Sequence, residues 1–521
     1  MAIRIYNTLT RRKEEFVPVV PGKVGIYSCG PTVYDYFHIG NARAFVVPDV
    51  IRRYLQYRGY NVTLVQNITD IEDKIIKRAA ERGVAPQNIV DEFTTAYIED
   101  REALGVRAPD IQPRATEHVG DMIDMIKILV EKGLAYVGDG DVYYDVSRFE
   151  PYGKLSNQNI DDLVAGARVD VGEAKQDPLD FALWKAAKPG EPSWDSPWGP
   201  GRPGWHIECS AMSTKYLGKT FDIHTGGVDL VFPHHENEIA QSHGANGVAP
   251  VRYWVHNGYI NVDGQKMAKS LGNFKTVRDI LQQYPGKVVR YFLISNHYRK
   301  PINFSDDELR MCERALSRLE DAIVNAAFTA SIDLDNREEM VRLAAAKSGK
   351  AWADDSAEAR LDGVVKEVRR RFEESMDDDF NTAGAIGSLH DLATALNTYV
   401  NREMPSPPNE EARVAISGAV LALMDLGDVL GIIDPSSMKP AAGRSGQFAG
   451  SVTGNAKEDE GELANAEKIV EGLVELLLDV RARAREAKEY GVSDMIRDRL
   501  AEMDIIVEDT RDGARWKFAS K

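Results

Sequence analysis

Apolar and polar residues alternate along the first third of the chain in a way that predicts strands and helices in turn. Residues 24–29, with the sequence VGIYSC, form an apolar run typical of a buried strand. Residues 41–60 place apolar side chains at helical spacing, and the β-branched segment at residues 61–69 predicts a second strand. The order strand, helix, strand favours a parallel sheet and therefore an α/β fold.

Further helices, a hairpin and a second α/β half are predicted before residue 303. Helical spacing recurs in three segments, residues 73–82, 88–104 and 117–132. Residues 135–146 then have the pattern of a hairpin around a Gly-Asp turn. Residues 188–204 are dense in Pro, Gly and Trp, so we expect an ordered loop that lines a site rather than a helix or a central strand.

Beyond residue 303 the pattern becomes helical. Ser305 and Glu308 have the spacing of a capping box, and the apolar residues after them recur every three or four positions. Cys312 lies on this apolar stripe, so we expect it to pack in a core rather than to take part in chemistry.

The remainder of the chain divides into a helical region, a linker and a small final unit. Helix-forming sequence extends the helical region over residues 304–434. Residues 435–462 have the composition of a flexible linker. Residues 463–521 predict a small unit with two helices and a tail that can pair as strands.

Length and cysteine content narrow the class of protein. A chain of 521 residues is too long for one hydrophobic core, so we expect several domains. Three cysteines argue against a disulfide framework and for a reducing compartment, so a cytoplasmic protein is expected. The sequence shows no signal-peptide core and no apolar stretch of membrane-spanning length, so a membrane is not an expected partner. The net charge of −17 gives no global sign of nucleic-acid binding, although local basic faces can still provide it.

Four residues from separate segments have the types that bind a metal ion. Cys29 follows the first predicted strand, and Cys209 lies far downstream. In the segment VFPHHENEIAQ, helical geometry places His234 and Glu238 on one face and His235 on another, and the proline before them suits a helix start. Such a set can hold zinc. The alternative is two small buried cysteines and a surface His–Glu pair, because ligands so far apart have no local spacing pattern.

Two further segments have the features of a phosphate site. The sequence HIGN at residues 38–41 lies between a predicted strand and a predicted helix, where glycine admits phosphate and a helix N-terminus favours anions. An imidazole there can donate a hydrogen bond to a phosphate oxygen. The sequence KMAKS places Lys266 and Lys269 on a glycine-flanked loop, suited to a leaving pyrophosphate. Either segment alone is explained as well by an ordinary turn or a solvated basic loop, but the two together indicate a nucleotide site.

These two segments resemble the paired motifs of class I aminoacyl-tRNA synthetases. The sequence around them is similar to one family in particular, cysteinyl-tRNA synthetase, over residues 1–382 and, thinly, over residues 482–516. The matching segments are NTLTRRKEEF, YSCGPTVYD, NITDIEDKIIKRA, RPGWHIECSAM, FDIHTGGVDLVFPHHENEIAQS, KMAKSLGNF and MDDDFNT.

The resemblance implies an α/β fold with a defined division of the chain. Residues 1–303 would form a Rossmann-type catalytic domain with a parallel sheet and an insertion at about residues 118–200. An α-helical bundle would follow at residues 304–434. The linker at residues 435–462 would lead to a small α+β anticodon-binding domain at residues 463–521.

The resemblance also implies that the activity is that of a cysteine–tRNA ligase. Its substrates would be L-cysteine, ATP and tRNA-Cys, with Mg²⁺ bound to ATP and a monomer as the working form. The implied ligands of one zinc ion are Cys29, Cys209, His234 and Glu238. A zinc ion would bind the substrate thiolate and so separate cysteine from serine, which a hydrophobic pocket cannot do strongly.

Individual roles in the pocket follow from the same resemblance. The residues implied at the ATP phosphates are His38, Asn41, Lys266 and Lys269. Those implied at adenosine are Gly40, Gly226, Gly227 and Asp229, together with Lys269 at the nucleotide. Those implied at the cysteine pocket are Trp205 and His224, with His206 nearby, although Trp205 fits simple loop packing equally well.

Two positions depart from the family motifs, and the C-terminal unit offers candidates for RNA contact. Asn41 stands where the first motif usually ends in His, and Ala268 stands where the second usually has Ser. Neither departure removes the main hydrogen-bond donors of its motif, so activity is expected. The C-terminal candidates are Arg481, Arg483, Arg485, Lys488, Tyr490, Arg497, Arg499 and Trp516. A solvated helix face is the alternative for them, because the segment is equally rich in acids.

Two rival functions remain open from the sequence. One is a cysteine ligase that uses the same adenylation core on an aminosugar acceptor, but such an enzyme would lack the C-terminal unit. The other is a catalytically inactive relative that binds RNA or regulates, against which the intact His38, Lys266, Lys269 and metal candidates argue.

Overall fold

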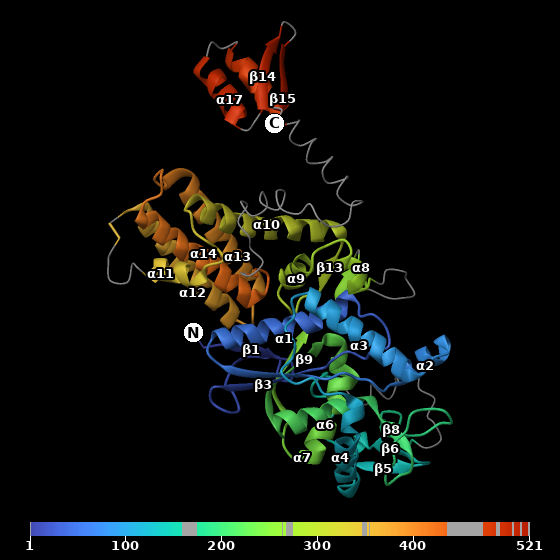
Figure 1. The fold of residues 1–521 in the computed structure, drawn as a ribbon. Helices are drawn as coiled ribbons and strands as arrows, with labels where there is room; N and C mark the ends of the chain where they lie inside the picture. Colours follow the sequence, from blue (N-terminus) through green and yellow to red (C-terminus); the bar gives the residue numbers. More distant parts are fainter. Residues whose placement is uncertain are drawn as a thin grey trace. The chain divides into compact units, whose positions relative to one another are not determined.

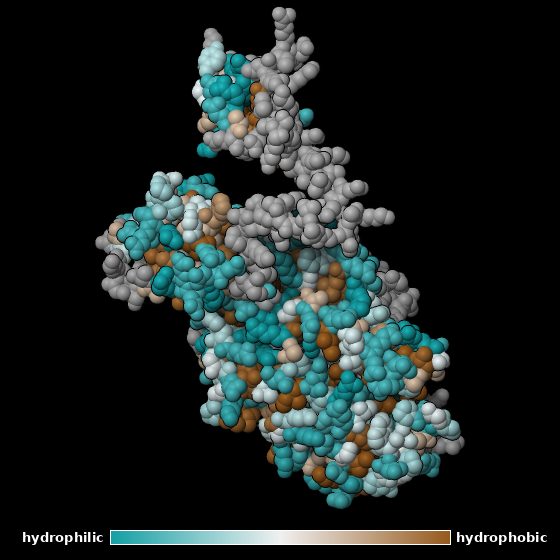
Figure 2. Space-filling view, in the orientation of Figure 1, coloured by the Kyte–Doolittle hydropathy of each residue, from teal (hydrophilic) through white to brown (hydrophobic). Residues whose placement is uncertain are grey.

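The computed structural model describes most of the chain as two separate units. The described residues are 2–158, 175–262, 264–266, 275–345, 352–353, 355–434, 473–485, 490–502, 505–510 and 513–518. The larger unit covers Met1–Ala441 and the smaller one Ala442–Lys521, coloured red in Figure 1. Among the described residues, no helix combines the length and apolarity needed to cross a bilayer. The face of the larger unit seen in Figure 2 is mostly hydrophilic, with apolar patches between.

A four-stranded parallel sheet forms the centre of the larger unit. Its strands are β3 (Lys23–Ser28), β4 (Asn61–Gln66), β9 (Phe221–Gly227) and β10 (Val251–Asn257), paired in the order β10-β9-β3-β4. Helix α1 (Ile39–Tyr57) connects β3 to β4, so the predicted strand-helix-strand order and α/β fold are confirmed. After β3 the chain forms β4, which pairs with one edge of β3, and much later it forms β9, which pairs with the other edge. The strand order therefore reverses between β3 and β9, where open α/β sheets bind ligands.

An antiparallel sheet lies between β4 and β9 in the sequence. Its strands β5 (Ala135–Gly138), β6 (Asp141–Tyr144), β7 (Phe181–Ala186) and β8 (Gly201–Pro203) pair in that order. The predicted hairpin is therefore confirmed as β5–β6. The three predicted helices correspond to α2 (Asp73–Arg82), α3 (Pro86–Ala103) and α4 (Val119–Glu131).

The Pro-, Gly- and Trp-rich segment at residues 188–204 packs differently from the prediction. Its last residues form the edge strand β8, and Trp194 pairs with Gly201 through its backbone. Trp198 lies against Trp184, with ring centroids 6.2 Å apart. The tryptophans therefore cover the antiparallel sheet, and the segment does not line the main cavity described below.

The rest of the α/β half surrounds the central sheet. The remaining strands are β1 (Arg4–Asn7), β2 (Arg12–Glu15), β11 (Ile260–Val262), β12 (Gln265–Lys266) and β13 (Ile302–Phe304). The remaining helices are α6 (Trp205–Leu217), α7 (Glu236–Asn246), α8 (Val277–Leu281) and α9 (Gly286–Ile294). Strand β11 pairs with β12 and β13, which brings the segment after β10 alongside the one after α9.

Helices pack together at the C-terminal end of the larger unit. They are α10 (Asp306–Thr329), α11 (Arg337–Ala345), α12 (Ala357–Asp377), α13 (Thr382–Thr398) and α14 (Glu410–Leu430). Ser305 caps α10 by accepting a hydrogen bond from the Glu308 N–H. Cys312 is buried in the core with Leu309 and Leu316, as expected.

The smaller unit has a core of its own. Residues 473–485 are helical, and α17 (Tyr490–Glu502) follows. Strands β14 (Ile505–Thr510) and β15 (Gly513–Phe518) pair antiparallel, which confirms the strand-forming tail. The buried residues of this core are Val474, Leu478, Leu500 and Ile505. The linker predicted at residues 435–462 lies outside the described residues.

Candidate active site and metal centre

A cavity of about 590 Å³ opens at the carboxyl ends of the parallel strands. Its lining includes Cys29, directly after β3, and Gly227, at the end of β9. The N-terminal turn of α1 and the segment after β10 also line it. The cavity therefore lies where the strand order reverses, the position expected for a ligand site in this class of sheet.

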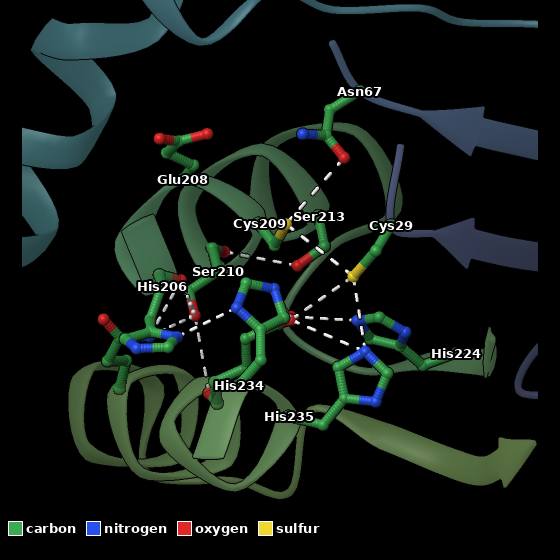
Figure 3. A network of polar contacts seen from close by, with 12 residues as sticks. Cys29, Asn67, His206, Glu208, Cys209, Ser210, Ser213, His224, His234 and His235 are labelled. Atoms are coloured by element: carbon green, nitrogen blue, oxygen red, sulfur yellow. Dashed lines mark hydrogen bonds and ion pairs between the residues drawn. The ribbon is translucent and has the colours of Figure 1, made fainter. Parts of the chain in front are cut away.

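Four candidate ligands from three segments meet beside the cavity, and Figure 3 labels Cys29, Cys209 and His234 among them. Cys29 Sγ lies 3.9 Å from Cys209 Sγ and 3.6 Å from Glu238 Oε1. His234 Nε2 lies 3.0 Å from the same carboxylate oxygen. The ligand atoms of all four residues lie within 4.8 Å of one another, and all four side chains are buried. Two sulfurs, a nitrogen and a carboxylate oxygen at this spacing fit a metal ion.

The segment that carries His234 and Glu238 begins its helix later than the sequence predicts. A π-helical turn at Val231–His235 contains Pro233, and α7 starts at Glu236. The backbone of Phe232 is non-helical, so the proline marks this turn and not the first turn of α7. The His234–Glu238 pairing survives, because both residues still follow helical geometry from His234 onward.

A second set of candidate ligands overlaps the first. Cys29, His224, His235 and Glu238 also place one ligand atom each within 4.8 Å of the others. Cys29, Cys209 and His234 line the cavity, whereas His224 and His235 do not. A metal ion that contacts a substrate must be open to the cavity. The geometry therefore favours the set that includes Cys209 and His234.

The histidines behind this set orient its members. His224 Nε2 lies 2.9 Å from Glu238 Oε2, and His206 Nδ1 lies 2.9 Å from His234 Nδ1. His235 Nε2 lies 3.3 Å from Cys29 Sγ. Partners of this kind hold ligand side chains in the geometry that a metal ion requires.

Electrostatics prepare the cluster for a cation. A hydrogen bond with Cys29 lowers the pKa of Cys209 to about 6 despite burial. Burial opposes ionisation of Glu238, but the charges of His224 and His234 outweigh it and lower the pKa of the carboxyl. Burial lowers the pKa of His234, yet Glu238 and Cys209 outweigh it and raise that pKa to about 10. The anionic sulfur and carboxylate thus hold a proton on His234, and a divalent cation would replace that proton.

The residues of the first motif lie at the N-terminus of α1, beside the cavity. His38 accepts a hydrogen bond from the Asn41 N–H at 3.3 Å, and the Asn41 side chain accepts one from the His38 N–H at 3.4 Å. His38, Gly40 and Asn41 all line the cavity. The partial positive charge at the N-terminus of a helix favours an anion. Asn41, which departs from the family motif, thus caps the helix reciprocally with His38.

The second motif is described only at its start. Lys266 belongs to β12, and its backbone pairs with that of Asn261. The Lys266 side chain lies outside the part that the structure describes. Ala268 and Lys269 lie outside the described residues. The Gly264 N–H donates to Asn303 Oδ1 at 2.6 Å, which ties the turn before the motif to β13.

The remaining predicted pocket residues divide into two groups. Gly227, Asp229 and Trp205 line the cavity. His224 and Gly226 do not: His224 lies behind Glu238, and a Cβ at Gly226 would come within 2.7 Å of His235 Cε1. Gly226 thus allows His235 to approach β9 closely. His206 is half-buried and lies beside His234.

The sequence analysis missed residues at the end of β4. Asn67 and Thr69 line the cavity, and Asn67 Oδ1 accepts a hydrogen bond from the Gly30 N–H at 3.0 Å. A Cβ at Gly30 would lie 1.5 Å from the Asn67 carbonyl oxygen, so only glycine fits there. Their position just beyond a predicted parallel strand was a signal that could have identified them.

Comparisons with known proteins agree on one family. A family model described as "tRNA synthetases class I (C) catalytic domain" matches residues 15–314. A "DALR domain" model matches residues 371–434, and a "Cysteinyl-tRNA ligase anticodon binding domain" model matches residues 472–516. A protein of Desulfitobacterium hafniense named cysteine–tRNA ligase is 49% identical over 519 residues, 99% of each chain. One of Thermococcus onnurineus with the same name is 46% identical over 520 residues, all of each chain.

Solved structures of other synthetases share the fold. Mycobacterium tuberculosis methionyl-tRNA synthetase with methionyl-adenylate aligns with a TM-score of 0.58 at 15% identity, covering 82% of this chain and 96% of that one. A structure described as a putative arginyl-tRNA synthetase of Campylobacter jejuni aligns with a TM-score of 0.54 at 12% identity, covering 79% and 92%. At these identities the likeness establishes the class I fold alone.

Proposed function

The chain belongs to the cysteine–tRNA ligase family, and we propose that it joins L-cysteine to tRNA-Cys in two steps that consume ATP. In the first step a carboxylate oxygen of cysteine attacks the α-phosphorus of ATP. The bond to the β-phosphate oxygen breaks, giving cysteinyl-adenylate and pyrophosphate. In the second step a terminal ribose hydroxyl of the tRNA attacks the acyl carbon, and AMP leaves.

The N-terminus of α1 stabilises the phosphate charge in the first step. His38 and Asn41 lie at the N-terminus of α1 and line the cavity, which supports their role at the α-phosphate. Gly40 has no side chain to keep the adenine away from the same turn. Lys266 and Lys269 neutralise the pyrophosphate end, together with Mg²⁺ that arrives with ATP.

The cysteine side chain is read at the base of the cavity. Cys29, Cys209, His234 and Glu238 would hold a zinc ion, and that ion would supply a soft Lewis acid that favours a thiolate over the hydroxyl of serine. Trp205 lies over His234, with ring centroids 4.4 Å apart, and closes this end of the pocket. Gly227 and Asp229 also line the cavity, and Asp229 can accept a hydrogen bond from an adenosine hydroxyl or from an amine.

The observation that carries the proposal is the meeting of two features in one cavity. Three of the four candidate metal ligands, Cys29, Cys209 and His234, line the same space of about 590 Å³ as the N-terminus of the helix that carries the family's first motif. The aminosugar alternative is not supported, because the anticodon-binding model matches residues 472–516. We further propose that the protein acts as a monomer in the cytoplasm, which sedimentation and cell fractionation would test.

Charging of transcribed tRNA-Cys with labelled cysteine, ATP and Mg²⁺ tests the proposal. We expect acid-precipitable label that disappears after removal of zinc and returns on its addition. Cysteine-dependent ATP–pyrophosphate exchange without charging would mean that the adenylation is right and the acceptor wrong. An absence of both reactions in zinc-loaded protein would contradict the proposal altogether.

A further inference from the structure

Arg43 is a buried arginine in the first turns of α1, two positions beyond the first motif. Its side chain is fully buried, and its guanidinium donates only to backbone carbonyls in the described structure. Nη1 donates to the carbonyl oxygens of Gly258 at 3.0 Å and Lys300 at 2.6 Å. Nη2 donates to the carbonyl oxygen of His297 at 3.1 Å. One side chain thus joins the segment after β10 to the loop at residues 297–300.

Burial of this cation is unfavourable, and no carboxylate of the described residues offsets it. Burial lowers the pKa of Arg43 to about 10, and no acidic side chain among the described residues is found within ion-pair distance of it. Carbonyl dipoles alone stabilise the charge, which is a costly arrangement for a purely structural contact. The planar guanidinium does, however, fix the separation of its acceptors in a way that a flexible ammonium cannot.

The carbonyls that Arg43 binds belong to a wall of the nucleotide cavity and to its support. Gly258, Tyr259 and Ile260 line the cavity, as do residues in the first turns of α1. The Gly258 N–H donates to the Tyr298 carbonyl at 2.9 Å. A Cβ at Gly258 would lie 2.7 Å from the Arg299 carbonyl oxygen, so the wall rests directly on the loop at residues 297–300.

The support is itself fixed on its far side. Asp379, at the turn between α12 and α13, is fully buried. It accepts hydrogen bonds from Tyr298 Oη at 2.7 Å and Arg299 Nε at 2.7 Å. The loop is therefore held against the helical region, and Arg43 sets the distance between that loop, the Gly258–Ile260 wall and helix α1.

We propose that Arg43 is a positioning residue for ATP: it holds the wall of residues 258–260 at the distance from α1 that the nucleoside requires. Arg43 itself is sealed from the cavity and touches no substrate. The inference rests on the proposed function, since it takes this cavity to be the ATP site. It predicts a defect in ATP binding that leaves cysteine binding at the metal cluster intact.

The test is Arg43→Lys, which keeps the charge and loses the planar fork. In ATP–pyrophosphate exchange we expect the KM for ATP to rise about tenfold, as expected when charge-assisted hydrogen bonds are lost, and the KM for cysteine to stay within about twofold. Arg52→Lys is the matched control, because Arg52 is a buried arginine of the same helix that donates to the Ala108 carbonyl and to Asp110. It should leave both KM values unchanged.

Gly258→Ala provides an independent variant that keeps Arg43 and moves the same wall against its support. It should also raise the KM for ATP alone, and it decides the matter if Arg43→Lys does not fold. An unchanged KM for ATP in Gly258→Ala and in a folded Arg43→Lys, or an equal rise in both KM values, would overturn the inference. Wild-type protein without exchange would count against the proposed function instead, and equilibrium dialysis of labelled ATP would then compare the variants directly.

Discussion

Cys209 and Cys312 are both buried, and their neighbours give the two thiols different chemistry. Cys312 lies among apolar side chains of α10, where burial raises its pKa to about 12. The pKa of Cys209 is lowered to about 6, first by its hydrogen bond with Cys29 and then by His234. A thiolate is the form that binds metal. Cys209 is therefore prepared to be a ligand at neutral pH, whereas Cys312 stays protonated.

This contrast predicts the metal content of two cysteine variants. Cys209→Ser should lower the zinc content of purified protein at least about tenfold, because a serine hydroxyl is a poor ligand for zinc. Cys312→Ala, the control, should keep the zinc content of the wild type. Elemental analysis by mass spectrometry measures both without reference to activity. Equal zinc in the two variants would show that Cys209 is not a ligand.

The sequence could identify the four candidate ligands but not their competitors. Helical spacing related His234 to Glu238, and the structure places these two side chains in contact. The sequence could not reveal that His224 contacts the Glu238 carboxylate or that His235 contacts Cys29, because those contacts join separate segments. Only the cavity, a property of the folded chain, separates the residues that face substrate from those behind them.

The surroundings of His390, where α9 meets α13, predict that the free energy of unfolding depends on pH. Its Nε2 lies 2.9 Å from Tyr291 Oη, and burial, aided by Arg318, lowers its pKa below 6.5. The neutral imidazole is therefore favoured in the folded state. Its contribution is complete above the unfolded pKa of about 6.5 and is lost as the pH falls through the folded pKa.

Urea unfolding of the wild type and His390→Gln from about pH 8 to about pH 5 measures this contribution. Glutamine can still pair with Tyr291 but does not titrate. We expect the wild type to lose free energy of unfolding relative to the variant as the pH falls below about 6.5. A difference that stays constant over the whole range would contradict the prediction.

Helix ends show which parts of an element the sequence can define. The Ser305 cap of α10 could be predicted because the Ser305 hydroxyl accepts from the Glu308 N–H, a donor only three residues away. The start of α7 was not, because the chain makes a π-helical turn at Val231–His235 while His235 packs against β9. Local chemistry sets the first boundary, and packing against a distant strand sets the second.

The glycine that caps the C-terminus of α14 gives a prediction about stability. Gly431 caps this helix with φ +68°, and a Cβ there would lie 2.5 Å from Cζ of the buried Arg290. Gly431→Ala should therefore lower the free energy of unfolding by about 2 kcal/mol or more, from backbone strain and displacement of that guanidinium. Arg290 donates to Asp49 of α1, so the effect should extend to the packing of α1 against α14.

Gly387→Ala is the matched control for this prediction. Gly387 lies at an exposed position of α13, and a Cβ there would meet no atom within 4 Å. Alanine should raise the free energy of unfolding by up to about 1 kcal/mol, because it is the better helix former. Urea unfolding measures both variants, and a loss of similar size in the two would show that the Arg290 contact is unimportant.

At the scale of the whole molecule, the two units have separate cores. The larger unit buries its own clusters around the parallel sheet and among the helices that follow. The smaller unit buries a cluster of four residues at its centre. Among the described residues, every candidate ligand and every lining residue of the cavity belongs to the larger unit, so we expect adenylate formation not to need the side chains of the smaller one.

A chain that ends at residue 441 should therefore separate the two steps of the reaction. We expect ATP–pyrophosphate exchange within about twofold of the full chain, since the cavity and its ligands remain. Charging of tRNA-Cys should fall at least about tenfold, because the contacts with single-stranded bases expected of the smaller unit are worth about 1–3 kcal/mol each. Thermal unfolding of the shortened chain controls for its integrity. Equal losses of exchange and charging in a folded protein would mean that the smaller unit supports the active site itself, and undiminished charging would mean that it does not read the tRNA.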